Sequence, residues 1–485
     1  MAESTKCGRR EFFRLAGLSA LGAGVATGCG GAQQTADDHL AGGGISFDRE
    51  TDVLIIGSGG AGLWAAYAAT EAGVSTVVVD KAPTYGGDTI LSCGVLPVHG
   101  TKAQEAQGVE DKGAAYWWDK SPIYSTGDRV PKIREISFTH SARCVDIWTE
   151  KLGVEWMPFE QGYSYYFHLP APGMDNVNRL LAPLFRHVRD AGAEFLFDTR
   201  ALTFILDPED RVVGARVREE VSGTVSDIRA KKILLATGDF IANQEKVARY
   251  LPQWSLLPTT THNSMGEGLD MALAVGASLE NMERPSNLTS DNAAVVVWGY
   301  WDPVLHLTPM GERFVNENHG HDVAGALHET GYHHWYCIFD DQLVTSRRGH
   351  SVEVLTKLGR VHRAHTLDEL AALTEIPADR LRAAVESYNA MCEAGEDPDF
   401  GRTLYLEPLN PPYYAAYAVP VRYKTNGGVR IDDHCRLIDA QDRPIANVFA
   451  AGSCSGTVSP NVAPVVASGL YAGECMIADL RGRAS

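Results

Sequence analysis

The sequence 53-VLIIGSGGAGLWAA-66 decides the fold of this chain, because an apolar run ends in a G-x-G-x-x-G spacing and an alanine-rich segment follows at once. In this spacing Gly57 permits a tight turn, Gly59 lets the backbone approach a pyrophosphate, and Gly62 allows a helix to pack against the strand. The free N–H groups at the helix start then face the phosphates. We predict a dinucleotide site whose contacts come from Gly57, Ser58, Gly59, Gly60, Ala61 and Gly62. The alternative is a glycine-rich turn in an ordinary βαβ unit.

A second apolar run supports this prediction. Residues 76–79 (TVVV) end in Asp80, and Lys81 follows. An acidic residue at the end of the second strand is where a ribose hydroxyl is bound. Strand, glycines, helix, second strand and terminal acid together are more specific than the glycines alone. We therefore expect a βαβ unit over 51–80 in which Asp80 and Lys81 contact the nucleotide.

Composition narrows the class of protein. The chain has 485 residues, enough for two or three domains, and a formal net charge of −18, which argues against nucleic acid as a partner. Its nine cysteines stand singly, with no C-x-x-C pair, so we predict no metal site, iron–sulfur cluster or attached c-type haem. Most of these cysteines should be small buried hydrophobic residues. Electrons for a redox reaction must then come from outside the chain.

Residues 1–45 differ from the rest of the chain. Arg9 and Arg10 precede Phe12 in a segment that resembles a twin-arginine export signal, and a short apolar stretch follows over 16–27. The next residues, up to Cys29, resemble a lipoprotein cleavage box, and 30–44 is typical of a flexible linker. We expect export to the periplasm or to the outer face of the cytoplasmic membrane, with or without a lipid anchor at Cys29. A disordered basic tail is the alternative.

The patterns after residue 45 predict an α/β fold with an insertion. We expect residues 46–257 and 411–485 to form the two parts of the nucleotide-binding domain. Residues 258–410 lack its strand–glycine–helix pattern and are predicted to form an inserted α+β capping domain that binds the substrate. Helical patterns cover 132–151, 178–192, 367–373 and 377–394, and strand patterns lie near 194–197, 212–218 and 233–236.

Five segments, in this order, resemble the fumarate reductase and succinate dehydrogenase flavoprotein family: 57–62 with Asp80, 86-GGDT-89, 236-ATG-238, 311-GERFVNE-317, and 427-GGVRID-432 through 450-AAG-452. The resemblance implies FAD, a Rossmann-type FAD-binding domain, a mobile capping domain, and hydride transfer between flavin N5 and a carbonyl-activated carbon–carbon bond. Segments within 93–111 and 467–469 are closer to the ketosteroid-dehydrogenase-like branch. The resemblance implies further FAD contacts at Gly86, Gly87, Asp88, Thr89, Gly94, Ala236, Thr237, Gly238, Glu267, Gly452, Ser468 and Gly469.

Departures from the family pattern concern the substrate. The catalytic arginine that the family keeps eight residues after Arg313 is replaced by His321, and its carboxylate-binding histidine falls where this chain has Lys424-Thr425-Asn426. The family's second carboxylate-binding arginine falls within the apolar stretch 460–466. Without the arginine clamp, fumarate loses its charge-assisted contacts, so we expect a less charged substrate. The steroid-enzyme tyrosine is replaced by Val466. No histidine stands at 88–90, where covalent family members carry one, so FAD should be noncovalent.

Reduction of an alkene also requires a proton donor within hydrogen-bond reach. His321 is the first candidate, because the resemblance puts it at the acid position and histidine titrates near neutral pH. Other candidates for contacting the substrate are Tyr165, Tyr166, His168, Lys424 and His262. For each histidine and tyrosine the alternative is a packing or surface role, and for Lys424 it is a solvated lysine.

Three functions remain open. The first is an exported FAD-dependent reductase of a carbonyl-conjugated C=C bond in an apolar or aromatic small molecule. The second is a ketosteroid-type dehydrogenase that runs in the opposite direction. The third is a noncatalytic flavin-binding electron-relay lipoprotein. Each requires an external electron donor or acceptor, such as a cytochrome or a quinone-linked protein.

Overall fold

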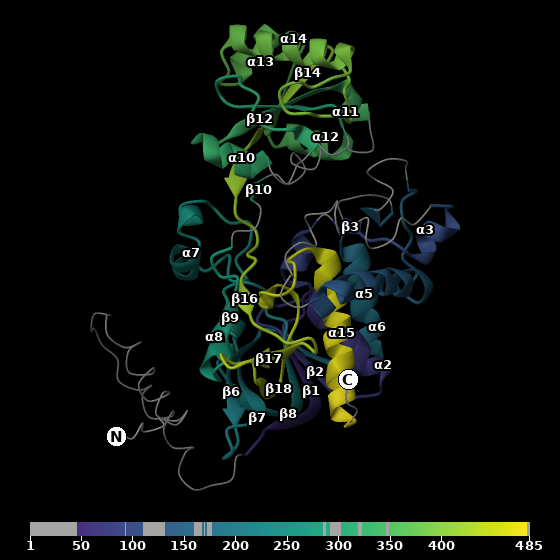
Figure 1. The fold of residues 1–485 in the computed structure, drawn as a ribbon, viewed down its shortest axis with the longest axis vertical. Helices are drawn as coiled ribbons and strands as arrows, with labels where there is room; N and C mark the ends of the chain where they lie inside the picture. Colours follow the sequence, from purple (N-terminus) through teal and green to yellow (C-terminus); the bar gives the residue numbers. More distant parts are fainter. Residues whose placement is uncertain are drawn as a thin grey trace, which may run out of the picture.

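The computed structural model describes residues 46–92, 94–109, 131–159, 167–168, 170–171, 177–284, 288–291, 302–318, 323–345 and 349–482. It forms two bodies joined by two neighbouring strands (Figure 1). We call the described residues of 46–284 and 422–482 the lower body, and the described residues of 302–418 the upper body. The predicted export signal, Tyr165, Tyr166 and His321 lie outside the described residues.

An eight-stranded sheet forms the centre of the lower body. Its main order is β17-β18-β8-β1-β2-β5, and β7 pairs with β8 and with β6. The strands from β18 to β5 are parallel, as expected for a dinucleotide-binding domain. Their bounds are β1 Arg49–Ile56, β2 Thr76–Val79, β5 Glu194–Leu196, β6 Thr199–Leu206, β7 Val212–Glu219, β8 Val225–Leu235, β17 Arg436–Ile438 and β18 Pro444–Ala450.

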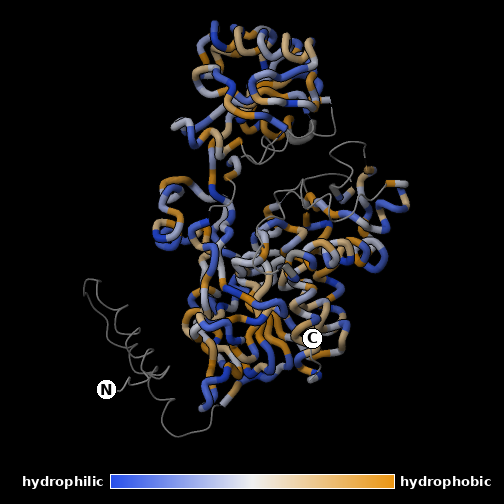
Figure 2. Tube along the Cα trace, in the orientation of Figure 1, coloured by the Kyte–Doolittle hydropathy of each residue, from blue (hydrophilic) through white to orange (hydrophobic). Residues whose placement is uncertain are grey.

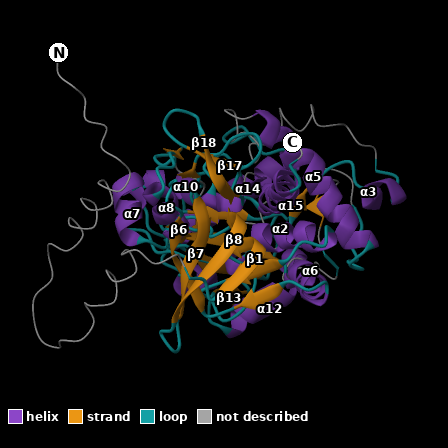
Figure 3. Ribbon diagram, turned by 90° about the horizontal axis from the view of Figure 1, so that it is seen from below, coloured by secondary structure: helices purple, strands orange, loops and turns teal. Residues whose placement is uncertain are grey.

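Helices cover one face of the parallel strands of this sheet (Figure 3). On one side, α2 (Gly60–Glu71) packs against α15 (Val462–Leu480) and α6 (Asn178–Asp190), and α15 also packs against α5 (Pro131–Glu150). Burial on both faces explains why the second half of β1 (53–56) and three of the four residues of β2 are apolar. Figure 2 shows this apolar centre beneath more polar outer turns. The other side carries α7 (Gln244–Tyr250) and α8 (Glu267–Ala274).

The upper body is built around the antiparallel sheet β11-β12-β14-β13, one face of which packs in a core cluster of its own, while residues of the other face, such as Trp335 and Phe339, belong to the larger cluster that includes the lower body. The strands are β11 Leu305–Leu307, β12 Trp335–Asp340, β13 Val361–Ala364 and β14 Tyr413–Ala418. Five helices surround it in the described residues: α10 Val323–Thr330, α11 Asp341–Thr345, α12 Gly349–Lys357, α13 Leu367–Leu373 and α14 Ala378–Ala394. The bodies are joined where β10 (Thr289–Ser290) pairs with β15 (Pro420–Val421).

The predicted capping segment 258–410 is divided between the two bodies. Helix α8 packs against β6, and β9 (Leu279–Glu280) pairs with β16 (Gly428–Val429), so residues 258–284 belong with the lower body. The inserted unit instead lies between the β10 and β15 strands. The sequence could not locate this crossing because short strands give little periodic signal. The remaining short elements are β3 Leu96–Pro97, β4 Phe167–His168, α3 Lys102–Ala106, η1 Gly87–Leu91, η4 Pro252–Trp254 and η6 Gly452–Cys454.

The predicted burial of the cysteines can be compared with these elements. The six cysteines that the structure describes as free are all buried: Cys144, Cys337, Cys392, Cys435, Cys454 and Cys475. Among the described residues, no helix combines the length and the apolar character needed to cross a membrane.

Candidate active site

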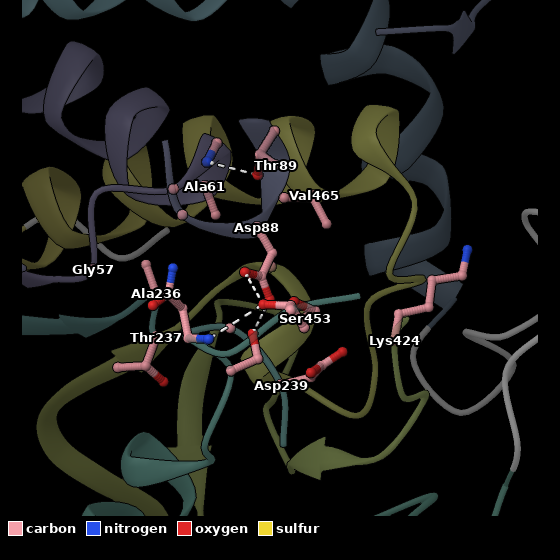
Figure 4. Close-up of a pocket in the computed structure, with 18 of the residues that line it drawn as sticks. Gly57, Ala61, Asp88, Thr89, Ala236, Thr237, Asp239, Lys424, Ser453 and Val465 are labelled. Carbon is pink, nitrogen blue, oxygen red and sulfur yellow. Dashed lines mark hydrogen bonds between the residues drawn. The ribbon is translucent and has the colours of Figure 1, made fainter. Parts of the chain in front are cut away.

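A cavity of about 550 Å³ lies where the loops after β1, β2 and β8 meet the late segments of the chain (Figure 4). Ligands of open α/β sheets bind at the carboxyl ends of parallel strands, and this cavity has that position. Of the predicted cofactor contacts, fourteen line it: Gly57, Gly59, Gly60, Ala61, Asp80, Lys81, Gly87, Asp88, Thr89, Ala236, Thr237, Gly238, Glu267 and Gly452.

The glycine turn leaves room for a phosphate. A Cβ added at Gly57 would lie 2.3 Å from the Ala236 carbonyl oxygen, and one at Gly62 would lie 1.9 Å from the Gly57 carbonyl oxygen. At Gly59, in contrast, the nearest protein atoms are 3.8 Å away, and this residue lines the cavity as the N-cap of α2. The turn is therefore closed toward the protein at Gly57 and Gly62 and open toward the cavity at Gly59. This arrangement fits a dinucleotide pyrophosphate at the helix N-terminus.

Asp80 fastens the turn from the end of β2. Its carboxylate accepts hydrogen bonds from the Ser58 N–H at 2.7 Å, from the Ser58 hydroxyl at 2.6 Å and from the Ala82 N–H at 2.9 Å. Ser58 is fully buried and does not line the cavity, so its role is to hold the turn. Beside Asp80, the Glu267 carboxylate accepts hydrogen bonds from Lys81 and Arg200, each at 2.5 Å.

Residues 86–89 approach the same turn from the opposite wall. The Gly86 N–H donates to the Ser58 carbonyl at 3.0 Å, and the Gly60 N–H donates to the Thr89 hydroxyl at 3.1 Å. Asp88 accepts hydrogen bonds from the hydroxyls of Thr261 and Ser264, each at 2.5 Å. These bonds join η1 to the segment that precedes α8.

Four predicted cofactor residues support the wall without lining it. Gly62 and Gly86 belong to the turn described above. The Ser468 hydroxyl accepts a hydrogen bond from the Gly452 N–H at 3.0 Å, and a Cβ at Gly469 would lie 2.2 Å from the Ala61 carbonyl oxygen. The first contact ties α15 to the loop after β18, and the second shows that α15 lies close against the first turn of α2. Gly94 is buried against Val177 and is also absent from the cavity lining.

Lys424 and Asp239 lie at neighbouring places on the cavity wall (Figure 4). The Lys424 ammonium donates to the Asn461 side-chain carbonyl at 2.7 Å. The Asp239 carboxylate accepts from the Ile241 N–H at 3.0 Å and from the Thr425 N–H at 2.7 Å. Burial lowers the pKa of Lys424 to about 8, although Asp239 opposes this change. A lysine in a cavity whose pKa lies close to neutral pH can bind a carboxylate or polarise a carbonyl group.

The other described candidates for contacting the substrate lie away from the cavity lining. His168 is completely buried, with its Nε2 atom 2.8 Å from the Thr101 hydroxyl oxygen and its ring against Trp156 and Phe159. His262 is exposed, while its neighbours Thr261 and Asn263 line the cavity. These positions favour the packing role for His168 and the surface role for His262.

The motif 311-GERFVNE-317 is rigidly held in the upper body. The Arg313 guanidinium makes paired hydrogen bonds to Glu317, at 2.9 and 2.7 Å, and to Asp397, at 2.9 and 2.7 Å. Both carboxylate side chains are fully buried, and Arg402 also reaches Glu317 at 3.4 Å. The position of His321 follows this anchored segment in sequence.

The sequence did not reveal that Arg200 bonds to Glu267 or that Asn461 bonds to Lys424. It also did not reveal that Asp239 and Lys424 lie on the same cavity wall. Asp239 follows the predicted 236-ATG-238 contact directly, which was a usable signal. Arg200 lies on β6, far along the chain from Lys81, and no local pattern connects the two. Asn461 is the residue before α15.

Comparisons with known proteins agree with this geometry. A family model described as an FAD binding domain matches residues 52–470. A urocanate reductase of Eggerthella lenta is 29% identical over 429 residues, covering 84% of this chain and 70% of that protein. A 3-oxosteroid 1-dehydrogenase of Mycolicibacterium smegmatis is 26% identical over 555 residues, covering 86% of this chain and 94% of that protein. The structure of the open conformation of a flavocytochrome c3 fumarate reductase is 28% identical, with a TM-score of 0.71, covering 88% of this chain and 78% of that one.

These findings confirm the predicted α/β FAD-binding fold, FAD as the cofactor, and the resemblance to both fumarate reductases and ketosteroid dehydrogenases. The open turn at Gly59 and the cavity beside it fit FAD as well. The chain therefore belongs to the FAD-binding-domain family and is an FAD-dependent oxidoreductase that acts on CH–CH groups.

Proposed function

We propose that the protein reduces a carbonyl-conjugated C=C bond in a small, largely apolar substrate that carries at most one negative charge. The observation that carries this proposal is the charge of the cavity wall. Three cations line it among the described residues, and Lys81 and Arg200 are already bonded to Glu267. The third, Lys424, is bonded to the neutral amide of Asn461. Lys424 is therefore the cavity cation that pairs with no carboxylate among the described residues. A single ammonium group of this kind can bind one carbonyl or carboxylate group of a substrate.

Bound FAD supplies a hydride at N5 for the β-carbon of the conjugated bond. The chain then has to orient the carbonyl group and deliver a proton. The Lys424 ammonium is held by Asn461 and can donate a hydrogen bond to the carbonyl or carboxylate oxygen of the substrate. Val462 and Val465 supply an apolar wall in the stretch where the family's second arginine is expected. His321 remains the proposed proton donor, with Tyr165 and Tyr166 as the next candidates.

The names of the relatives support this reaction class. The fumarate and urocanate reductases are named for reduction of C=C bonds conjugated to carboxyl groups. The 3-oxosteroid 1-dehydrogenase is named for the opposite direction, and it favours dehydrogenation as the second candidate function.

The test is anaerobic reoxidation of the dithionite-reduced protein by a panel of enones, cinnamates, fumarate and steroids. The return of the absorbance of the oxidised flavin measures the rate. We expect an enone or a monocarboxylate to reoxidise the flavin much faster than buffer, and fumarate to be poor. Reduction of the oxidised protein by a saturated ketosteroid would instead support the dehydrogenase. If no compound exceeds the buffer rate, the reductase proposal fails and the electron-relay alternative gains. Rapid turnover of fumarate would overturn the proposed substrate.

The setting of the reaction is also a proposal. The sequence around Arg9 and Arg10 supports twin-arginine export, and Cys29→Ala tests the lipid anchor, since an unchanged membrane fraction would exclude acylation. We propose noncovalent FAD, because residues 88–90 include no histidine. A cytochrome or a quinone-linked protein is the proposed electron donor.

A further inference from the structure

Asp239 is a buried carboxyl group that forms no direct ion pair within the described part of the chain. It is 3% exposed, and it accepts two hydrogen bonds from backbone N–H groups, those of Ile241 and Thr425. These backbone donors favour the ionised form of the carboxyl group, while burial favours the neutral form. Asp239 is therefore a carboxyl group that can change its protonation state when the charge of the cavity changes.

The charged and titratable groups that act on Asp239 come from three segments. Asp88, on η1, repels its negative charge, and Lys424, after β15, attracts it. Cys454, on η6, is a buried thiol whose pKa is raised to about 11, chiefly by burial, so it stays neutral below that pH. Burial is the main cause that raises the pKa of Asp239 to about 7, the backbone donors oppose it, and the repulsion from Asp88 adds to it.

We propose that binding of a single carboxylate at Lys424 is coupled to uptake of one proton by Asp239. This inference rests on the proposed function, in which Lys424 receives the oxygen atoms of the substrate. A bound carboxylate places a third negative charge beside Asp88 and Asp239, against one ammonium group. Asp239 takes up a proton from solvent and becomes neutral, which balances the negative charge of the ligand. The positive charge of Lys424 then interacts with the ligand rather than with Asp239. The Asp88 carboxylate already accepts hydrogen bonds from the Thr261 and Ser264 hydroxyls, whereas Asp239, among the residues that the structure describes, accepts only from backbone N–H groups and lies next to Lys424 on the cavity wall.

The position of Asp239 also makes it a positioning residue for Lys424. Its bond to the Thr425 N–H holds the backbone next to Lys424 against the end of β8. A protonated carboxyl retains a carbonyl oxygen that can accept this bond. Proton uptake can therefore change the charge without releasing Lys424 from its place.

The test is isothermal titration calorimetry of the oxidised, FAD-loaded protein with propionate and 3-phenylpropionate, in buffers that differ in ionisation enthalpy. The dependence of the heat on the buffer gives the number of protons taken up. With an Asp239 pKa of about 7, uptake by Asp239 can reach about 0.1 proton per carboxylate at pH 6 and about 0.5 at pH 7. The corresponding amides are the matched neutral ligands and should take up none.

Two variants separate the roles. Asp239→Asn should bind 3-phenylpropionate with proton uptake at pH 7 reduced at least about fivefold, because the side chain no longer titrates. Lys424→Met should weaken binding of the carboxylate at least about tenfold and leave binding of the amide within about twofold. If Asp239→Asn does not fold, the wild-type comparison of pH 6 with pH 7 decides the matter, since equal uptake at both would overturn the proposal.

Other outcomes also overturn it. Absence of proton uptake at pH 7, uptake unchanged in Asp239→Asn, or no binding of either carboxylate each contradicts the coupling. If Lys424→Met loses carboxylate binding while uptake in Asp239→Asn equals that of the wild type, only the coupling fails. Failure of every compound to reoxidise the reduced flavin refutes the proposed function, and calorimetry on the oxidised protein is independent of that result.

Discussion

The substitution Gly59→Ala should separate cofactor binding from folding. Gly59 has φ −68° and ψ −175°, which alanine adopts without strain, and the nearest atoms to an added Cβ are 3.8 Å away. Replacing glycine by alanine at a compatible position stabilises a protein by about 0.4–1 kcal/mol through the unfolded chain. Gly59 is also the N-cap of α2, where alanine is less favourable than glycine, so the two effects offset each other and the apoprotein of this variant should unfold close to the wild-type temperature.

FAD binding, in contrast, should weaken. Gly59 lines the cavity at the N-terminus of α2, so the new methyl group occupies the path by which the pyrophosphate reaches the helix N–H groups. A lost hydrogen bond to a charged group costs about 1.5–3 kcal/mol, and each 1.4 kcal/mol corresponds to about tenfold in Kd. One such loss should raise the Kd for FAD by roughly 10- to 150-fold.

The assay is titration of the apoprotein with FAD, followed by flavin fluorescence, beside thermal unfolding of the same apoprotein. Gly62→Ala is the contrasting variant, because its Cβ would lie 1.9 Å from the Gly57 carbonyl oxygen and must displace backbone. It should lower both stability and FAD affinity. An unchanged Kd in Gly59→Ala would refute pyrophosphate binding at this turn, and a large loss of apoprotein stability would refute the geometry.

The remaining predictions concern the cofactor, export, the proton donor and the upper body. Acid precipitation should release yellow FAD into the supernatant, and Asp80→Ala should weaken retention; flavin in the pellet would contradict noncovalent binding. Lysine at Arg9 and Arg10 should leave precursor in the cytoplasm, whereas continued export refutes the signal. His321→Ala should slow substrate-driven reoxidation at least about 100-fold at unchanged FAD content, and a few-fold change would assign the acid elsewhere. Although burial opposes ionisation, bonds from Arg313 lower the pKa of Asp397 to about 2, so Asp397→Asn should cost about 2 kcal/mol at pH 7 in urea unfolding. That difference should disappear as the pH falls from about 4 to about 2, and an equal urea midpoint at pH 7 would contradict it.

The nucleotide-binding part of the fold could be predicted from sequence because its signals are local. The glycine turn, α2 and the strand before Asp80 fall within 51–80, where continuous apolar runs and the glycine spacing can be read directly from the sequence. The parallel order around β1 follows from such a unit. The division of 258–410 between two bodies could not be predicted, because it depends on the pairing of β9 with β16 and of β10 with β15, strands of two residues each.

The site was predictable only where its residues belong to a local motif. Gly59 and Asp80 were found in this way, and both line the cavity. The contacts that set its charge join residues far apart in sequence: Asp88 meets Thr261 across 173 positions, and Asp239 meets the Thr425 N–H across 186. Such pairs are decided by packing, and a single sequence does not show which buried acid lies beside which amine.

The attachment of Lys424 has a consequence for the two bodies. The chain returns from the upper body through β15, and the next residues are tied to the lower body. Arg422 donates to the Trp254 carbonyl at 3.3 Å and to the Gln244 side chain at 2.6 Å, and Thr425 donates to Asp239. Lys424 lies between these two anchors. A rotation of the upper body about the β10–β15 pair would therefore leave the amine fixed beside the FAD cavity, and only groups contributed by residues 302–418 would move toward or away from it.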